Sequence, residues 1–97
     1  MQAFSLKNQV ALITGASKGI GFSIAEFFAE AGAKVVISSR DQAALDSLAQ
    51  ELRAKGYEAT GIACHVGKMD QLAHLVSATI ATYGQIDILV NNAATNP

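Results

Sequence analysis

The apolar residues of this chain form two kinds of pattern that alternate along its length. In the first, short runs are rich in β-branched residues, which favour β-strands. These runs lie at positions 10–13, 35–37, roughly 58–64, and 86–90. In the second, apolar residues recur every three or four positions, as they do on one face of an α-helix. The pattern therefore predicts four strands that alternate with three helices.

Each predicted helix carries an apolar stripe that we expect to be buried. Each also ends at a glycine, which commonly follows the last turn of a helix: Gly32, Gly56 and Gly84. Asp41 is the expected N-cap of the second helix, and Asp70 lies near the positive end of the third. The stripes consist of Ile20, Ile24, Phe27, Phe28 and Ala31 in the first helix, Leu45, Leu48 and Leu52 in the second, and Leu72, Leu75, Val76, Thr79, Ile80 and Tyr83 in the third.

Three of the predicted strands are continuously apolar, which is typical of strands covered on both faces in a parallel sheet. Right-handed crossovers then give an α/β fold with a doubly wound, Rossmann-type sheet in the order 3-2-1-4. In that order the strand at 86–90 lies at an open edge with unpaired backbone groups. We therefore expect a truncated fold, the N-terminal part of a larger protein whose next strand pairs there. A partner chain could cover the same edge.

Composition narrows the class of protein. A chain of 97 residues with 51% hydrophobic and 15% charged residues suits one small globular domain. The net charge of −1 without a basic block argues against a nucleic-acid partner. Cys64 is the single cysteine, and no apolar stretch approaches the ~20 residues of a membrane span. Because the first residues also lack a secretion-signal pattern, we expect a cytoplasmic protein that does not contact a membrane.

The segment 14–21 reads Thr-Gly-Ala-Ser-Lys-Gly-Ile-Gly, directly after a predicted strand and at the start of a predicted helix. Gly15 would allow the tight turn, while Gly19 and Gly21 would admit a pyrophosphate and let the helix pack closely. Ser17, Lys18 and Ile20 belong to the same turn, and the helix N-terminus would attract phosphate charge. This context predicts a dinucleotide-binding segment over residues 1–97. The alternative is a glycine turn with a steric role only.

The end of the second strand indicates which dinucleotide binds. It reads Ser38-Ser39-Arg40, where NAD-binding proteins place an acidic residue against the ribose hydroxyls. Arg40 and Lys18 could instead donate charge-assisted hydrogen bonds to a 2′-phosphate, with Ser39 beside them. The sequence therefore predicts NADP in preference to NAD. The alternative is that both cations are ordinary solvated surface residues.

Two motifs resemble the short-chain dehydrogenase/reductase family: the turn at 14–21 and the segment 87–93, which reads Asp-Ile-Leu-Val-Asn-Asn-Ala. The resemblance covers essentially the whole chain. It implies hydride transfer between a nicotinamide and an alcohol or carbonyl carbon, in a parent protein that is a homo-oligomer. It also implies that Asn91, Asn92 and Ala93 line the adenosine side of the cofactor site and steady the sheet.

Two positions depart from the family pattern. His65-Val66 stands where the family usually has Asp-Val near the adenine, and Ala94 replaces a glycine. His65 can exchange hydrogen bonds but supplies no fixed negative charge, and Val66 could contribute through its backbone. The wider strings 64–68 and 91–97 resemble a subgroup of NADP-dependent carbonyl or retinal reductases.

The residues for catalysis are missing from this sequence. The family's reaction needs a Tyr with a Lys four residues later, but Tyr57 is followed there by Gly61 and Tyr83 by Asp87. His65, His74 and Cys64 fit no zinc spacing, and Cys64 lacks an activating partner, so we expect no metal site and no catalytic residue. The first interpretation is the cofactor-binding part of an NADP-dependent oxidoreductase, inactive alone. The second is a stand-alone, non-catalytic nucleotide-binding or interaction module.

Overall fold

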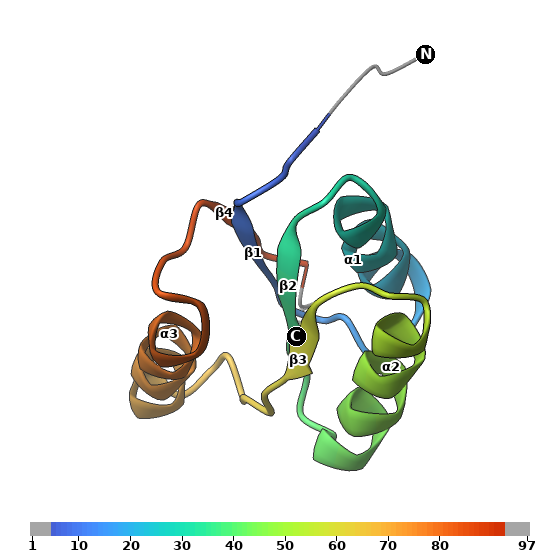
Figure 1. Ribbon diagram of the computed structural model, residues 1–97. Helices are drawn as coiled ribbons and strands as arrows, with labels where there is room; N and C mark the ends of the chain where they lie inside the picture. The colour runs from blue at the N-terminus through green and yellow to red at the C-terminus, as the bar shows by residue number, and fades with distance from the viewer. Residues whose placement is uncertain (1–4, 93–97) are drawn as a thin grey trace.

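The computed structural model describes residues 5–92, and in this part of the chain strands and helices alternate as the sequence predicts. The strands form one parallel sheet in the order β3-β2-β1-β4, which confirms the predicted fold. In Figure 1, α1 and α2 lie on one side of the sheet and α3 lies on the other. The elements are β1 (Val10–Ile13), α1 (Gly19–Glu30), β2 (Lys34–Ile37), α2 (Gln42–Ala54), β3 (Ala59–Gly61), α3 (Met69–Tyr83) and β4 (Ile88–Val90).

The register of the sheet brings the carboxyl ends of all four strands to one edge. Ile13 at the end of β1 pairs with Ile37 of β2 and with Val90 of β4. Ile37 in turn pairs with Gly61 at the end of β3. The loops that leave these strands therefore meet along a single edge, which is where open α/β sheets bind ligands.

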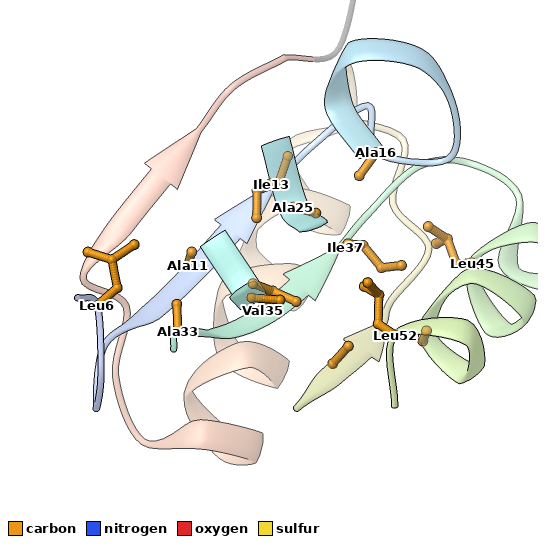
Figure 2. Packing of buried hydrophobic residues seen from close by; sticks show 13 residues of the cluster. Leu6, Ala11, Ile13, Ala16, Ala25, Ala33, Val35, Ile37, Leu45 and Leu52 are labelled. Atoms are coloured by element: carbon orange, nitrogen blue, oxygen red, sulfur yellow. The ribbon is translucent and has the colours of Figure 1, made fainter. Parts of the chain in front are cut away.

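The core has two parts, one on each face of the sheet. Between the sheet and helices α1 and α2 lies the larger cluster, which Figure 2 shows and which includes Ile13, Val35 and Ile37. Under α3 lies a smaller cluster formed by Leu12, Val36, Cys64 and Leu75. Successive residues of a strand point to opposite faces, so β1 and β2 contribute to both clusters and have to be apolar throughout.

Two strands are shorter than the sequence suggested. β3 ends at Gly61, although the apolar run continues to Cys64. Its partner β2 ends at Ile37. Beyond that point the two segments are joined by isolated hydrogen bonds, such as that from the Cys64 N–H to the Ser39 carbonyl (2.7 Å). β4 begins at Ile88 rather than at 86, and just before it the Val10 N–H of β1 donates to the Asp87 side chain (Oδ2, 2.8 Å) instead of to a main-chain carbonyl.

The apolar stripe predicted for α1 is confirmed in part, since Ile24, Phe28 and Ala31 pack against the larger cluster whereas Ile20 and Phe27 do not. Ile20 and Phe27 are 73% and 56% exposed, whereas the buried residues of α1 are Gly21, Ala25 and Ala29. Small side chains at the buried positions let the helix axis approach the sheet closely, and Ile24, Phe28 and Ala31 pack around them against the larger cluster. The periodicity therefore predicted part of the packed face of α1 and misplaced Ile20 and Phe27.

The stripe of α3 was correct in its centre and wrong at its margin. Leu75 and Thr79 are buried, whereas Val76 and Ile80 are 43% and 47% exposed.

The predicted ends and caps of the helices are confirmed more fully. The Asp41 side chain accepts a hydrogen bond from the Ala44 N–H at 3.1 Å, and α3 ends at a left-handed glycine.

Candidate functional site

The glycine turn between β1 and α1 has a backbone that only glycine adopts easily. Gly15 and Gly19 both have φ of +62°, in the left-handed region. Gly21 is constrained by space instead, since a Cβ there would lie 2.1 Å from the Gly15 carbonyl oxygen and 2.6 Å from Asn92 Nδ2. The first turn of α1 is therefore seated directly on the loop that leaves β1.

The N-terminus of α1 has no side-chain cap. Lys18 is the N-cap residue, its backbone is extended, and its side chain makes no capping hydrogen bond. The first turn of α1 also carries no acidic residue, whereas α2 is capped by the Asp41 carboxylate. Uncapped N–H groups together with the helix dipole attract an anion.

Thr14 connects the glycine turn to the segment that follows β4. Its side chain is buried, and its Oγ1 accepts a hydrogen bond from the Asn92 N–H at 3.0 Å and lies 3.1 Å from Asn91 Oδ1, to which it donates. Asn92 Nδ2 donates to the Gly15 carbonyl at 3.2 Å. Both asparagines are predicted site residues, whereas Thr14, which opens the glycine motif, had no predicted role. Ala93 lies outside the described residues.

The two serine side chains at the end of β2 form hydrogen bonds to neighbouring backbone groups. Ser38 is fully buried and donates to the Ile62 carbonyl at 2.7 Å, and Ser39 Oγ accepts from the Asp41 N–H at 3.2 Å. Arg40 is exposed. The nearest carboxylate in sequence is that of Asp41, whose Oδ1 caps α2 by accepting from the Ala44 N–H.

His65 meets Arg40 across the gap between the ends of β2 and β3. Arg40 Nη1 lies 3.1 Å from His65 Nε2, and the other ring nitrogen, Nδ1, lies 3.0 Å from the Gly67 nitrogen. The backbone N–H of His65 donates to Gln71 Oε1 at 2.8 Å. Val66, which the sequence placed in the site, packs against the cluster under α3. Gly67 and Gln71 were missed, because nothing in a single sequence ties them to a histidine side chain.

The structure joins only some of the predicted site residues. Hydrogen bonds link Gly15 to Asn92 and Arg40 to His65. Within residues 5–92, the side chains of Ser17 and Lys18 form no hydrogen bond to these groups. Lys18 is exposed and Ser17 is half-buried at the turn. They therefore share an edge of the sheet with Arg40 without being fixed to it.

Cys64 and Tyr83 have surroundings typical of residues that support the fold. Burial raises the pKa of the Cys64 thiol, which disfavours the reactive thiolate. Tyr83 Oη lies 2.9 Å from Thr60 Oγ1, and the ring packs against the cluster under α3. In the described part of the chain, no group of three or more His, Cys, Asp or Glu side chains could hold a metal ion. Nor does that part contain a helix long and apolar enough to cross a membrane.

A parallel sheet in this order, with a glycine turn entering a helix at its carboxyl edge, defines a Rossmann-type dinucleotide-binding fold. The family described as short chain dehydrogenase matches residues 9–97, so the chain belongs to that family.

Known relatives support this assignment along nearly the whole chain. The protein named short-chain dehydrogenase/reductase SDRA of Arabidopsis thaliana is 48% identical over 95% of the chain and 36% of its own length. Dehydrogenase/reductase SDR family member 4 of Homo sapiens is 48% identical over 95% of the chain and 33% of its own length. A metagenomic short-chain oxidoreductase crystallised with NADP superposes with a TM-score of 0.87 and 41% identity, covering 93% of this chain and 41% of its own. The chain thus spans about a third of the length of the curated relatives that it matches.

Proposed function

We propose that this chain supplies the NADP-binding part of an oxidoreductase that transfers a hydride between the nicotinamide and an alcohol or carbonyl carbon. The observation that carries the proposal is the glycine turn, with the uncapped N-terminus of α1 above it and Arg40 beside it. In this proposal residues 1–97 are one dinucleotide-binding segment. The residues proposed to contact the cofactor are Gly15, Ser17, Lys18, Gly19, Ile20, Gly21, Ser39, Arg40, His65, Val66, Asn91, Asn92 and Ala93.

The turn fits a diphosphate for a reason that its own geometry supplies. Gly21 lets the first turn of α1 pack on the Gly15 carbonyl, while at Gly19 an added Cβ would meet nothing within 4 Å, so the start of the helix is open. The first-turn N–H groups of α1 would donate to the phosphate oxygens, and the helix dipole would add to the attraction. Thr14, Asn91 and Asn92 would keep the corner in place, since their hydrogen bonds fasten it to the segment after β4.

The preference for NADP rests on charge at the end of β2. Arg40 is exposed there, Lys18 is exposed in the neighbouring turn, and Asp41 Oδ1 caps α2. A guanidinium can form two parallel hydrogen bonds to a phosphate, whereas Ser38-Ser39-Arg40 offers no carboxylate to the two ribose hydroxyls of NAD. A relative of similar fold that was crystallised with NADP is consistent with this choice.

The groups that carry the proton are proposed to lie in a further segment. None of the 97 residues forms a Tyr-x-x-x-Lys pair, and the relatives are about three times as long as the matched region. The bound cofactor would supply the hydride or accept it, and this chain's residues would hold the cofactor. In the same proposal the whole protein is a homo-oligomer that acts on a small carbonyl or alcohol substrate.

A titration of both cofactors against the intact gene product tests the proposal. We expect NADP to bind more tightly than NAD, and Arg40→Gln to weaken NADP binding about tenfold to a hundredfold while leaving NAD nearly unchanged, because hydrogen bonds to charged groups contribute about 1.5–3 kcal/mol. Lys7→Gln is the matched control, since Lys7 is an exposed cation on the amino side of β1. Equal binding of the two cofactors by the unmodified protein would contradict the proposed preference.

A further inference from the structure

His65 occupies a place in the site that its own contacts define closely. Its backbone N–H is bonded to Gln71 Oε1, and its ring lies close to Gly67, where an added Cβ would come within 2.9 Å of His65 Cε1. The ring edge that remains open faces Arg40, with 3.1 Å between Nε2 and Nη1. The imidazole is therefore held by the loop after β3 and directed towards the guanidinium at the end of β2.

The two contacts of the ring compete for one lone pair. A neutral imidazole accepts a hydrogen bond at one nitrogen and donates from the other. Here a donor faces each nitrogen, since the Arg40 guanidinium faces Nε2 and the Gly67 N–H faces Nδ1. A hydrogen bond from a charged donor is roughly twice as strong as one from a neutral donor. The guanidinium should therefore take the lone pair, which leaves the ring proton on Nδ1.

We propose that His65 is a positioning residue for the 2′-phosphate of the cofactor, acting through Arg40. A guanidinium has five N–H donors in a planar fork, and His65 uses only one of them, on Nη1. The remaining N–H groups stay free to donate in pairs to a phosphate. By fixing one corner of the fork, His65 restrains an exposed side chain whose rotamer freedom would otherwise be lost on binding. The inference rests on the proposed binding of NADP.

This role explains how the chain uses a neutral residue where the family usually has an acid. An aspartate facing Arg40 would pair with the guanidinium and neutralise its charge beside the phosphate. A neutral imidazole accepts one hydrogen bond and leaves the positive charge uncompensated. The substitution thereby keeps Arg40 both ordered and fully attractive to an anion.

Three substitutions of His65 separate positioning from simple packing. Gln can place its amide oxygen near the position of Nε2 and still accept from Arg40, whereas Asn reaches only as far as Nδ1 and Phe accepts at neither position. We expect His65→Gln to retain the ratio of NADP to NAD affinity, and His65→Asn and His65→Phe to lower it about twofold to tenfold, the range of one ordinary hydrogen bond. His74→Asn is the control, since His74 is exposed on α3.

The outcomes of the cofactor titration are distinct. If the intact gene product favours NADP but His65→Asn and His65→Phe keep its full preference, the positioning role is wrong and the proposed function stands. If the substitutions weaken NADP and NAD equally, His65 has a packing role only, and the inference is again overturned. If the unmodified protein does not favour NADP, the proposed function itself fails.

The ring proton gives a second readout that packing alone would not move. Nitrogen-15 NMR of the imidazole at about pH 8.5, above the range in which histidines ordinarily titrate, distinguishes the two neutral forms. We expect the proton of His65 on Nδ1 in the unmodified protein and on Nε2 in Arg40→Gln, where the Gly67 N–H gains the free lone pair. A proton on Nε2 in both proteins would overturn the inference.

Discussion

The two edges of the sheet, at β3 and at β4, differ in how completely the apolar side chains near them are buried. On the side of α2 and β3, the apolar face of the helix is fully covered, and Leu45, Ala49 and Leu52 are at most 1% exposed. On the side of β4, Leu89 is 64% exposed. On the other face of β4, which faces α1, an apolar hollow of about 520 Å³ is lined by Ile20, Ser23, Ile24, Phe27, Phe28 and Val90.

The difference teaches that equal apolar content does not mean equal stabilisation. Burial of apolar surface contributes about 25 cal/mol per Å², so a covered leucine contributes far more than a phenylalanine left in contact with water. Near α2, the described residues alone bury the apolar face of the helix. The side of β4 is an apolar surface of the kind that marks interaction sites in soluble proteins. The expectation of a neighbouring strand beside β4 remains a prediction.

The largest expected effect is a contrast between one residue from each side. In the 97-residue chain, Leu52→Ala should lower the free energy of unfolding by about 2–5 kcal/mol, since it leaves a cavity in the packed core. Phe27→Ala should change it by less than about 1 kcal/mol, because Phe27 is 56% exposed. Urea unfolding of both variants measures the contrast, and equal losses would remove the distinction between the two sides. Repeating the pair in the intact gene product sharpens it, since any segment covering the hollow would raise the cost of Phe27→Ala.

The next effect concerns the glycine turn, which touches both sides. Gly21→Ala should destabilise the fold by about 1–3 kcal/mol, because its Cβ would collide with the Gly15 carbonyl, which is backbone and cannot rotate away. The collision would also displace Asn92 Nδ2 from its bond to the same carbonyl, so cofactor binding should weaken as well. Ser23→Ala, an exposed change on the same helix, serves as the control for unfolding and for titration. Normal stability and binding in Gly21→Ala would refute this account of the corner.

The same contrast explains how much the sequence could predict. Strand order and the closing glycines followed from local patterns, because β1 and β2 are covered on both faces and each helix ends in its own chemistry. The orientation of α1 that leaves Ile20 and Phe27 exposed could not be predicted in this way. This orientation depends on how closely Gly21, Ala25 and Ala29 let the helix approach the sheet, which is a property of the packed pair of elements rather than of the helix alone.

The site divides along the same line between local and long-range information. The turn at 14–21 was recognisable because its glycines are adjacent in sequence and its role is local. The contact of Arg40 with His65 spans 25 residues and depends on the register of β2 with β3, and the bonds of Thr14 to Asn91 and Asn92 span 77 and 78. A single sequence offers no record of such pairings. The three-dimensional fold was needed to find them.

The smallest expected effect concerns the ion pair that joins α1 to α2. Lys55 at the end of α2 forms an ion pair with Glu26 of α1, and the hydrogen bond and charge of Glu26 raise the pKa of Lys55 above its usual 10.5. A raised pKa means that the folded state binds the proton more tightly than the unfolded state. The contribution of the pair is therefore fully present below about pH 10.5 and is lost as the pH rises through the higher folded value. We expect Lys55→Gln to flatten the fall in stability between about pH 10 and pH 12 in urea unfolding, with Lys7→Gln as an unpaired control. Because both side chains of the pair are solvent-accessible, salt should weaken the effect, and an equal fall in all three proteins would show that the pair adds nothing to the packing of the two helices.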